Sequence, residues 1–195
     1  TSILTNQITE FNSNRIAINL KFEGLKLMPL ALRLTNNLLV NKIEPLLLWS
    51  DPGSAALAKR DNNELKDYIC VFKDIITNKV NPKGKEILIA VAPQHYDYNE
   101  FKEVCDLYNG IILMINGKLE DTSVGIGSVG RDRRKDFILS WEYIYSLEPF
   151  SKGALMRSYP DNWTLFNLTK DGYKYLETFD RRPDQSLIIE SLMNS

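Results

Sequence analysis

The chain has 195 residues, of which 44% are hydrophobic and 25% are charged, and it contains only 10 glycines and 8 prolines. This composition excludes a disordered, collagen-like or low-complexity protein, and it predicts one globular domain over residues 1–195. Lys and Arg number 24 against 25 Asp and Glu, so the formal net charge of -1 excludes a global attraction to nucleic acid or to an anionic membrane.

The first 60 residues predict two strands and two helices. Residues 15–24 alternate apolar and polar side chains, which is the pattern of a half-buried strand, and we place it at an edge of the sheet. Residues 25–40 repeat leucine at helical spacing, with Pro29 near the front, where a helix tolerates proline. Residues 43–50 form a short apolar run that predicts a strand, followed by a turn and a helix over residues 55–60.

The middle of the chain alternates predicted strands and helices. Residues 67–76 and 86–92 are rich in apolar and β-branched side chains and predict two strands. Residues 98–108 place their apolar side chains on one helix face, and residues 111–115 predict the next strand. A strand, a helix and a strand joined by short connections predict a parallel pair covered by helices.

The pattern changes near residue 141. A basic amphipathic helix is predicted over residues 131–141. In residues 141–195, aromatic-rich runs alternate with turn residues, which predicts an antiparallel meander with a final helix. The runs are residues 141–147, 154–159, 163–168 and 173–179, with Glu148-Pro149, Pro160-Asp161 and Asp171-Gly172 between them and a helix over 184–193. The predicted fold class is therefore α/β, a three-layer, mostly parallel sheet with a C-terminal antiparallel extension.

The chain offers few groups for metal binding or catalysis. Its two cysteines, Cys70 and Cys105, are 35 residues apart and the chain has a single histidine, so we expect no zinc or other metal site and no cofactor. Both cysteines have contexts that predict reduced, buried residues of a cytosolic or stromal protein. No apolar run has the length of a membrane span.

A glycine-rich segment before the basic helix is the first candidate site. Residues 125–130 read G-x-G-x-x-G, and backbone N–H groups, a helix N-terminus and arginines together suit a phosphoryl group. The segment does not follow a strand closely, as a dinucleotide site requires, so a protein-docking surface or a solvated basic turn are the alternatives. The candidate residues are Gly125, Gly127, Gly130, Arg131, Arg133 and Arg134.

The second candidate follows the strand that ends near Trp49. Asp51, Gly53 and Ser54 lie where loops surround the ligand crevice of a parallel α/β sheet, although Ser54 as a helix cap is the simpler interpretation. A third candidate is His95, which is either a general base or acid, since histidine as a residue type exchanges protons near neutral pH, or a surface residue. No nucleophile or carboxylate pair accompanies it, so we predict no catalytic residue.

The aromatic residues of the C-terminal third have two interpretations. Their spacing predicts that most pack in a core or stack across strands, whereas an exposed subset would be a partner surface. Basic residues do not interleave with them as a nucleic-acid groove requires, so we expect no nucleic-acid partner. These residues are Trp141, Tyr143, Tyr145, Tyr159, Trp163, Phe166, Tyr173 and Tyr175.

Several fragments carry a family resemblance. The fragments are, in chain order, LLLWSDPGSAALAKRD, EILIAVAPQ, GKLEDTSVGIGSVGRDRRKDFILSWEYIYSLEP and GALMRSYPDNWTLF. Together they resemble an uncharacterised domain family of cyanobacteria and plastids, which includes the plant low-photosystem-II-accumulation proteins and an extra domain of a chloroplast adenylate kinase. The match runs from Glu44 to the C-terminus and is weak over residues 1–43; its strongest parts are Asp51 to Asp61, Leu119 to Arg134 and Arg157 to Trp163.

The resemblance implies a non-enzymatic accessory or assembly factor of the photosynthetic apparatus, of the photosystem II type. It implies a place in the cyanobacterial cytoplasm or the chloroplast stroma, peripheral to the thylakoid and without a membrane span. Its expected partners are photosystem or assembly proteins, and it implies no established catalytic residues. The alternative is a protein that binds a phosphorylated small molecule or nucleotide through the glycine-rich segment. Kinase activity is not transferred, because the chain has no G-x-x-x-x-G-K-[ST] motif.

Overall fold

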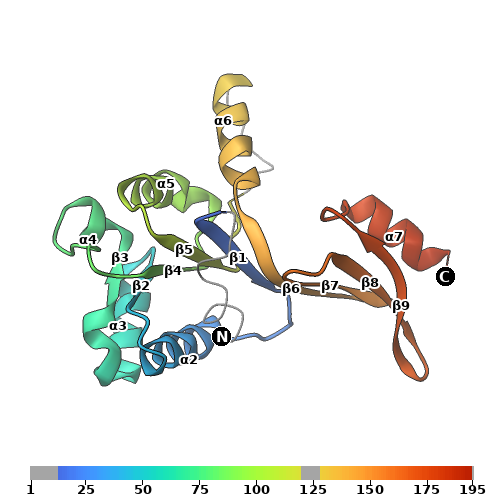
Figure 1. The fold of residues 1–195 in the computed structure, drawn as a ribbon, viewed down its shortest axis with the longest axis horizontal. Helices are drawn as coiled ribbons and strands as arrows, with labels where there is room; N and C mark the ends of the chain where they lie inside the picture. Colours follow the sequence, from blue (N-terminus) through green and yellow to red (C-terminus); the bar gives the residue numbers. More distant parts are fainter. Residues whose placement is uncertain (1–12, 120–127, 195) are drawn as a thin grey trace. The chain divides into compact units, whose positions relative to one another are not determined.

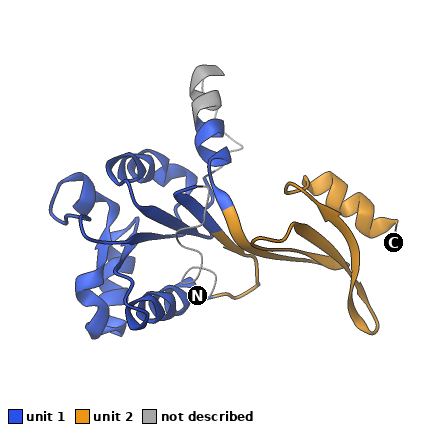
Figure 2. Ribbon diagram, viewed as in Figure 1, with its two compact units in different colours: residues 1–17, 26–142 blue, residues 18–25, 143–195 orange. Residues whose placement is uncertain are grey.

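The protein divides into two compact units. The structure is a computed structural model that describes residues 13–119 and 128–194, with the side chains of 128–133 not described. Unit 1 comprises Thr1–Ala17 and Lys26–Glu142, and unit 2 comprises Ile18–Leu25 and Tyr143–Ser195 (Figure 2). The second division falls close to residue 141, where the sequence changes from alternating strands and helices to an aromatic-rich meander.

The strands form a nine-stranded sheet in the order β3-β2-β4-β5-β1-β6-β7-β8-β9 (Figure 1). The pairs β2–β3, β2–β4 and β4–β5 are parallel, and every residue of β2 and β4 is buried. Strands of a parallel sheet are covered on both faces, which explains why these runs are continuously apolar. The strands of this half are β1 (Arg15–Leu20), β2 (Pro45–Trp49), β3 (Ile69–Val71), β4 (Ile87–Val91) and β5 (Ile111–Ile115).

Helices cover both faces of the parallel strands. Figure 1 shows α2 (Leu27–Val40) and α3 (Pro52–Asp61) on one side, and α4 (Phe72–Ile76) and α5 (Tyr98–Leu107) on the other. On its buried side, α5 places Phe101, which stacks on Phe72 of α4 with ring centroids 5.4 Å apart. The three-layer α/β arrangement predicted from the sequence is confirmed.

The direction of the connections reverses between β2 and β4. The chain leaves β2 through α3 toward β3 at one edge, and leaves β4 through α5 toward β5 on the other side. In open α/β sheets such a reversal leaves a crevice outside the carboxyl ends of the two strands, where ligands commonly bind.

Unit 2 contains the antiparallel strands and one helix. The pairs β6–β7, β7–β8 and β8–β9 are antiparallel, and α7 covers one face of them (Figure 1). Ile188 and Leu192 of α7 pack with Leu155, Trp163 and Leu165 of the strands into a buried core. The elements are β6 (Glu142–Phe150), β7 (Gly153–Ser158), β8 (Trp163–Thr169), β9 (Gly172–Phe179) and α7 (Gln185–Met193).

Three local predictions were wrong. Residues 67–76 are not one strand, because β3 ends at Val71 and α4 follows, started by the Asp74 carboxylate, which accepts the Val71 N–H at 3.2 Å. The first strand is not at an edge, since β1 lies between β5 and β6. Glu148-Pro149 does not end a strand, because β6 continues to Phe150 and Pro149 lies opposite Ala154.

The other predicted strands and helices are confirmed within a few residues of their ends, including the predicted turn at Asp171-Gly172, where Gly172 has φ 107°. The basic helix is α6 (Ser128–Leu139), which starts three residues before the expected position. In the described part of the chain, no helix combines the length and apolar character that crossing a membrane requires.

Candidate functional site

The carboxyl edge of unit 1 holds two of the predicted candidates. Leu48 of β2 lies opposite Ala90 of β4 in a parallel register, so the segments that follow these two strands leave the sheet side by side. The first segment carries Asp51, and the second carries His95. This edge is the point of reversal between β2 and β4, and we call it the carboxyl edge.

Asp51 is the N-cap of α3. Its Oδ1 accepts the Ser54 N–H at 2.7 Å, and Pro52 takes the adjoining position at the helix start, where its missing N–H costs nothing. Hydrogen bonds from the Ser54 side chain and backbone hold the pKa of the Asp51 carboxyl below its usual value. The predicted cap therefore exists, but Asp51 and not Ser54 provides it.

Gly53 lies in the first turn of the same helix. A Cβ built at this position would lie 3.1 Å from Asp51 Oδ1, which is tighter than ordinary van der Waals contact. The absence of a side chain thus leaves room for the capping carboxylate. Asp51, Gly53 and Ser54 lie together at the carboxyl edge, where a ligand or partner role for them stays a prediction.

Arg134 of α6 also reaches the carboxyl edge. Its NH2 group donates a hydrogen bond of 2.6 Å to the His95 carbonyl, and its guanidinium carbon Cζ lies 4.3 Å from the centre of the Tyr98 ring. These contacts fix the segment after β4 and engage the charge of Arg134 with protein groups. His95 is exposed, and its ring meets Tyr96 edge to face at 5.2 Å.

The backbone at this edge is unusual in two places. Ala92 and Asn116, the residues directly after β4 and β5, have φ 48° and 50°, a left-handed conformation that is uncommon for residues other than glycine. The Ala92 N–H donates to the Ile115 carbonyl at 2.7 Å, and the Lys118 N–H to the Pro93 carbonyl at 2.8 Å. Such conformations cluster at functional sites, so they support a role for this edge.

Trp49, the last residue of β2, carries a donor without an acceptor. The residue is buried, and its Nε1–H has no hydrogen-bond partner among the described residues. Buried donors nearly always have an acceptor, so an unpaired indole N–H needs an explanation. The apolar run LLLW carries no sequence signal for such a group, and sequence reasoning missed it.

The remaining predicted residues belong to the glycine-rich segment and the start of α6. Gly125 and Gly127 lie outside the described residues. Gly130, Arg131 and Arg133 lie in α6, but their side chains are not among those described. A cavity of about 340 Å³ lies at the opposite edge, beside the amino ends of β4 and β5. The segments 81–85 and 107–110 contribute to its lining, and it contains none of the predicted residues.

Unit 2 carries a second candidate surface on the sheet face opposite α7. The core under α7 uses Leu155 and Leu165, and because side chains alternate along strands, their neighbours point to the other face. Ala154, Phe166 and Tyr175 lie opposite one another on three adjacent strands. We call this surface the outer sheet face, and it consists of Leu147, Ala154, Met156, Phe166, Leu168, Tyr173 and Tyr175.

The outer sheet face exposes large side chains. Tyr175 is 65% exposed, Tyr173 is 55% exposed and Leu168 is 46% exposed, whereas Trp141 and Trp163 of the same third of the chain are buried. The helix of unit 2 in the described part of the chain, α7, packs on the other face (Figure 1). The structure thus divides the C-terminal aromatic residues into a core set and an exposed set.

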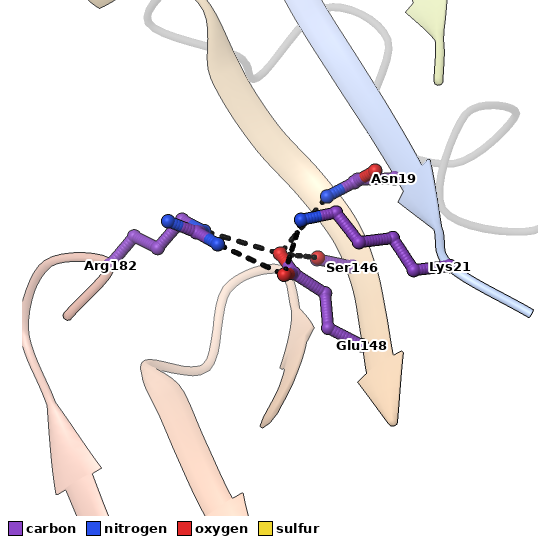
Figure 3. A network of polar contacts seen from close by, with 5 residues as sticks. All are labelled: Asn19, Lys21, Ser146, Glu148 and Arg182. Carbon is purple, nitrogen blue, oxygen red and sulfur yellow. Dashed lines mark hydrogen bonds and ion pairs between the residues drawn. The ribbon is translucent and has the colours of Figure 1, made fainter. Parts of the chain in front are cut away.

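A buried carboxylate holds unit 2 together. Glu148 of β6 is only 2% exposed, and its two oxygens accept hydrogen bonds from five side-chain atoms on four residues (Figure 3). The bonds come from Lys21 Nζ at 2.7 Å, Arg182 at 2.9 and 3.2 Å, Asn19 Nδ2 at 3.0 Å and Ser146 Oγ at 3.4 Å. Burial alone would raise the pKa of Glu148, but Arg182 and Lys21 outweigh it and lower the pKa.

The Glu148 network is structural, and no pattern in the sequence indicates it. Its members come from segment 18–25, from β6 and from the segment after β9, and Lys21 and Glu148 are 127 residues apart. The single carboxylate is held by two cations and two neutral donors from separate segments, which suits a joint between segments better than a reacting centre.

Comparison with known proteins gives a family without an assigned activity. No curated protein matches the chain. The model of one family does match, over residues 4–188, which is nearly the whole chain and includes the N-terminal residues whose resemblance was weak. The chain therefore belongs to the family described as a domain of unknown function, DUF1995.

Proposed function

We propose that the protein is a non-enzymatic accessory or assembly factor of the photosynthetic apparatus, of the photosystem II type, that acts through protein–protein contacts. The fragments around Asp51, Leu119 and Arg157 support the link to the low-photosystem-II-accumulation proteins and to the extra domain of a chloroplast adenylate kinase. The same link implies that the protein is located in the cyanobacterial cytoplasm or the chloroplast stroma, at the thylakoid surface.

The observation that carries the proposal is the outer sheet face. Its centre is apolar, and Tyr173 and Tyr175 add large aromatic rings that end in a polar hydroxyl. Tyrosine is enriched at protein interfaces because one side chain supplies both a large apolar area and a hydrogen bond. Because these side chains stand on paired strands, binding would not require ordering of their backbone.

A phosphorylated small molecule or nucleotide is the second candidate ligand. The unpaired Trp49 Nε1–H and the position of the carboxyl edge at the chain reversal favour it. Two contacts weigh against it. The Asp51 carboxylate occupies the start of α3 and would repel an anion there. The Arg134 NH2 group already donates to the His95 carbonyl and the guanidinium lies over the Tyr98 ring, although its buried Nε–H has no partner among the described residues.

The test compares two surfaces with matched tyrosine variants. Tagged wild type, the double variant Tyr173→Ser/Tyr175→Ser and the single variant Tyr96→Ser are cross-linked and recovered from the photosynthetic host, and co-purified proteins are identified by mass spectrometry. Tyr96 is 73% exposed and lies at the carboxyl edge, so its variant controls for the loss of an exposed tyrosine.

The expected result is that wild type and Tyr96→Ser recover photosystem or assembly proteins and that the double variant loses them. Loss in Tyr96→Ser alone would move the contact surface to the carboxyl edge. Recovery of no photosystem or assembly protein by wild type, together with quenching of Trp fluorescence by inorganic phosphate or a nucleotide, would replace the proposal by the second candidate.

A further inference from the structure

Strand β9 is the long free edge of the sheet. It stands last in the strand order and, among the described residues, pairs only with β8. β9 has eight residues, whereas β3 at the other edge has three. An edge strand presents backbone N–H and C=O groups that can pair with another strand, and short length is one of the ways in which proteins suppress such pairing. β9 lacks that protection.

A bulge in β9 changes which side chains share a face. Leu165 lies opposite Glu177, whereas its neighbour Phe166 lies opposite Tyr175, so β9 holds one extra residue, Leu176. Residues 165 and 167 of β8 share a face because they are two apart. Their partners Glu177 and Lys174 therefore also share a face, although they are three residues apart along β9.

This spacing makes β9 complementary to itself. If two copies of β9 run antiparallel about a two-fold axis between Tyr175 and Leu176, Lys174 of each copy lies opposite Glu177 of the other. The symmetry creates this opposite-charge pair twice. The same register places Tyr173 opposite Thr178, and both lie on the face opposite that of Lys174 and Glu177. It also places Gly172 opposite Phe179, whose aromatic ring can cover the backbone of the glycine.

Both charged groups are available for such pairing. Lys174 forms an ion pair with Asp171 at 3.3 Å, and the two side chains are 60% and 81% exposed. An ion pair between such exposed side chains contributes little free energy, so Lys174 can exchange it for another partner. One oxygen of Glu177 accepts from Ser191 Oγ of α7 at 3.0 Å, which fixes the carboxylate beside the edge and leaves its second oxygen for a partner.

We propose that β9 pairs with β9 of a second copy of this chain, forming a two-fold dimer with a continuous antiparallel sheet. The charge pattern selects the second copy over an unrelated strand, because one register satisfies both ion pairs at once. In the dimer, Tyr173 and Tyr175 of the two copies join into one apolar surface. The inference concerns the purified protein alone and does not depend on the proposed function.

The test measures self-association of the full chain by sedimentation over a range of concentrations. Lys174→Glu places a glutamate opposite Glu177 of the partner in both pairs, and Glu177→Lys places a lysine opposite Lys174 in both pairs, so each single variant is expected to dimerise at least about 10-fold more weakly than wild type. The double variant Lys174→Glu/Glu177→Lys exchanges the charges and is expected to regain dimerisation.

A mixture of the two single variants gives the decisive result. In the mixed dimer the two glutamates of Lys174→Glu face the two lysines of Glu177→Lys, so an equimolar mixture is expected to dimerise although neither variant does so alone. This outcome cannot arise from misfolding. A wild type that stays monomeric, single variants that dimerise like wild type, or a mixture that stays monomeric would each overturn the proposal.

Discussion

Glu148 shows how one residue can define a local structure. A buried carboxylate is costly unless cations and donors surround it, and here Lys21 and Arg182 supply two positive charges while Asn19 and Ser146 supply neutral donors. Because both cations are partly exposed, the pairs are weaker than those of a fully buried triad. The carboxylate still decides where the segment that carries Lys21 must lie.

The first prediction concerns the charge of Glu148. Glu148→Gln keeps the shape and removes the charge, and we expect it to lower the free energy of unfolding at pH 7 by about 2 kcal/mol, the scale of hydrogen bonds to charged groups. Folding lowers the pKa of Glu148, so its stabilising effect is complete above its unfolded pKa, near 4.5, and is lost as pH falls through the lower folded value. Urea denaturation at pH 7 and at pH 3 should therefore show a smaller difference between wild type and variant at pH 3.

A control for this prediction is Glu44→Gln. Glu44 pairs with Lys85 at 2.9 Å, but its side chain is half exposed, so we expect a change below about 1 kcal/mol. An equal loss in both variants, or a difference for Glu148→Gln that does not depend on pH, would contradict the account of Glu148.

At the scale of elements, two helices begin in the same way. α3 starts at Asp51 and α7 at Asp184, and each carboxylate accepts a backbone N–H three residues later, at 2.7 Å from Ser54 and 2.9 Å from Leu187. The two helices belong to different units. They therefore provide the same interaction in two settings.

The second prediction is that Asp51→Ala and Asp184→Ala each cost about 1 kcal/mol of stability, because each leaves helix N–H groups without an acceptor. Asp51→Asn and Asp184→Asn should retain most of the wild-type stability, since asparagine caps a helix almost as well as aspartate. Hydrogen exchange monitored by mass spectrometry should show faster exchange confined to the unit that carries each alanine. Unchanged stability in Asp51→Ala would mean that the cap is dispensable and that Asp51 serves binding instead.

The sequence predicted those elements whose pattern is local. The continuous apolar runs of β2, β4 and β5 and the one-sided apolar face of α5 each suffice to identify an element. The five-residue helix α4 was missed, because its start depends on the Asp74 carboxylate and its apolar residues also suit a strand. The bulge at Leu176 leaves no local trace either, since it is defined by the register against β8.

The candidate site was predicted in part for the same reason. Asp51 follows a recognisable strand, so its place at the carboxyl edge could be expected. Arg134 was singled out for its charge, but its contact with His95 joins residues 39 apart and could not be foreseen. Glu148 was interpreted as part of a turn because proline follows it, and only the contacts with Lys21 and Arg182 explain its burial.

At the scale of the whole molecule, each unit is assembled from separate stretches of chain. Unit 2 uses Ile18–Leu25 together with Tyr143–Ser195, and the Lys21 N–H donates to the Leu147 carbonyl at 3.0 Å. Residues from the first stretch thus contribute both to the backbone pairing of unit 2 and to the ion pairs of Glu148. Residues 143–195 alone therefore do not provide all the contacts that stabilise unit 2.

The third prediction follows from this composition. A fragment of residues 143–195 lacks Asn19 and Lys21, which leaves Glu148 with fewer donors and one cation, and we expect no cooperative thermal unfolding by circular dichroism. The same fragment with residues 15–25 joined through a flexible linker should unfold cooperatively. Equal, cooperative unfolding of both fragments would show that the first stretch contributes little.

The split composition of unit 2 also sets an order of events during synthesis. Lys21 is made 127 residues before Glu148, which at about 5–20 residues per second means a delay of about 6–25 s during synthesis. By the time Glu148 is added, strands β1 to β5 have all been made, whereas the exposed Phe22 and the rest of residues 21–25 still lack the later strands of unit 2. The nascent chain therefore completes unit 2 only when its latest strands emerge and residues 21–25 can pair with them.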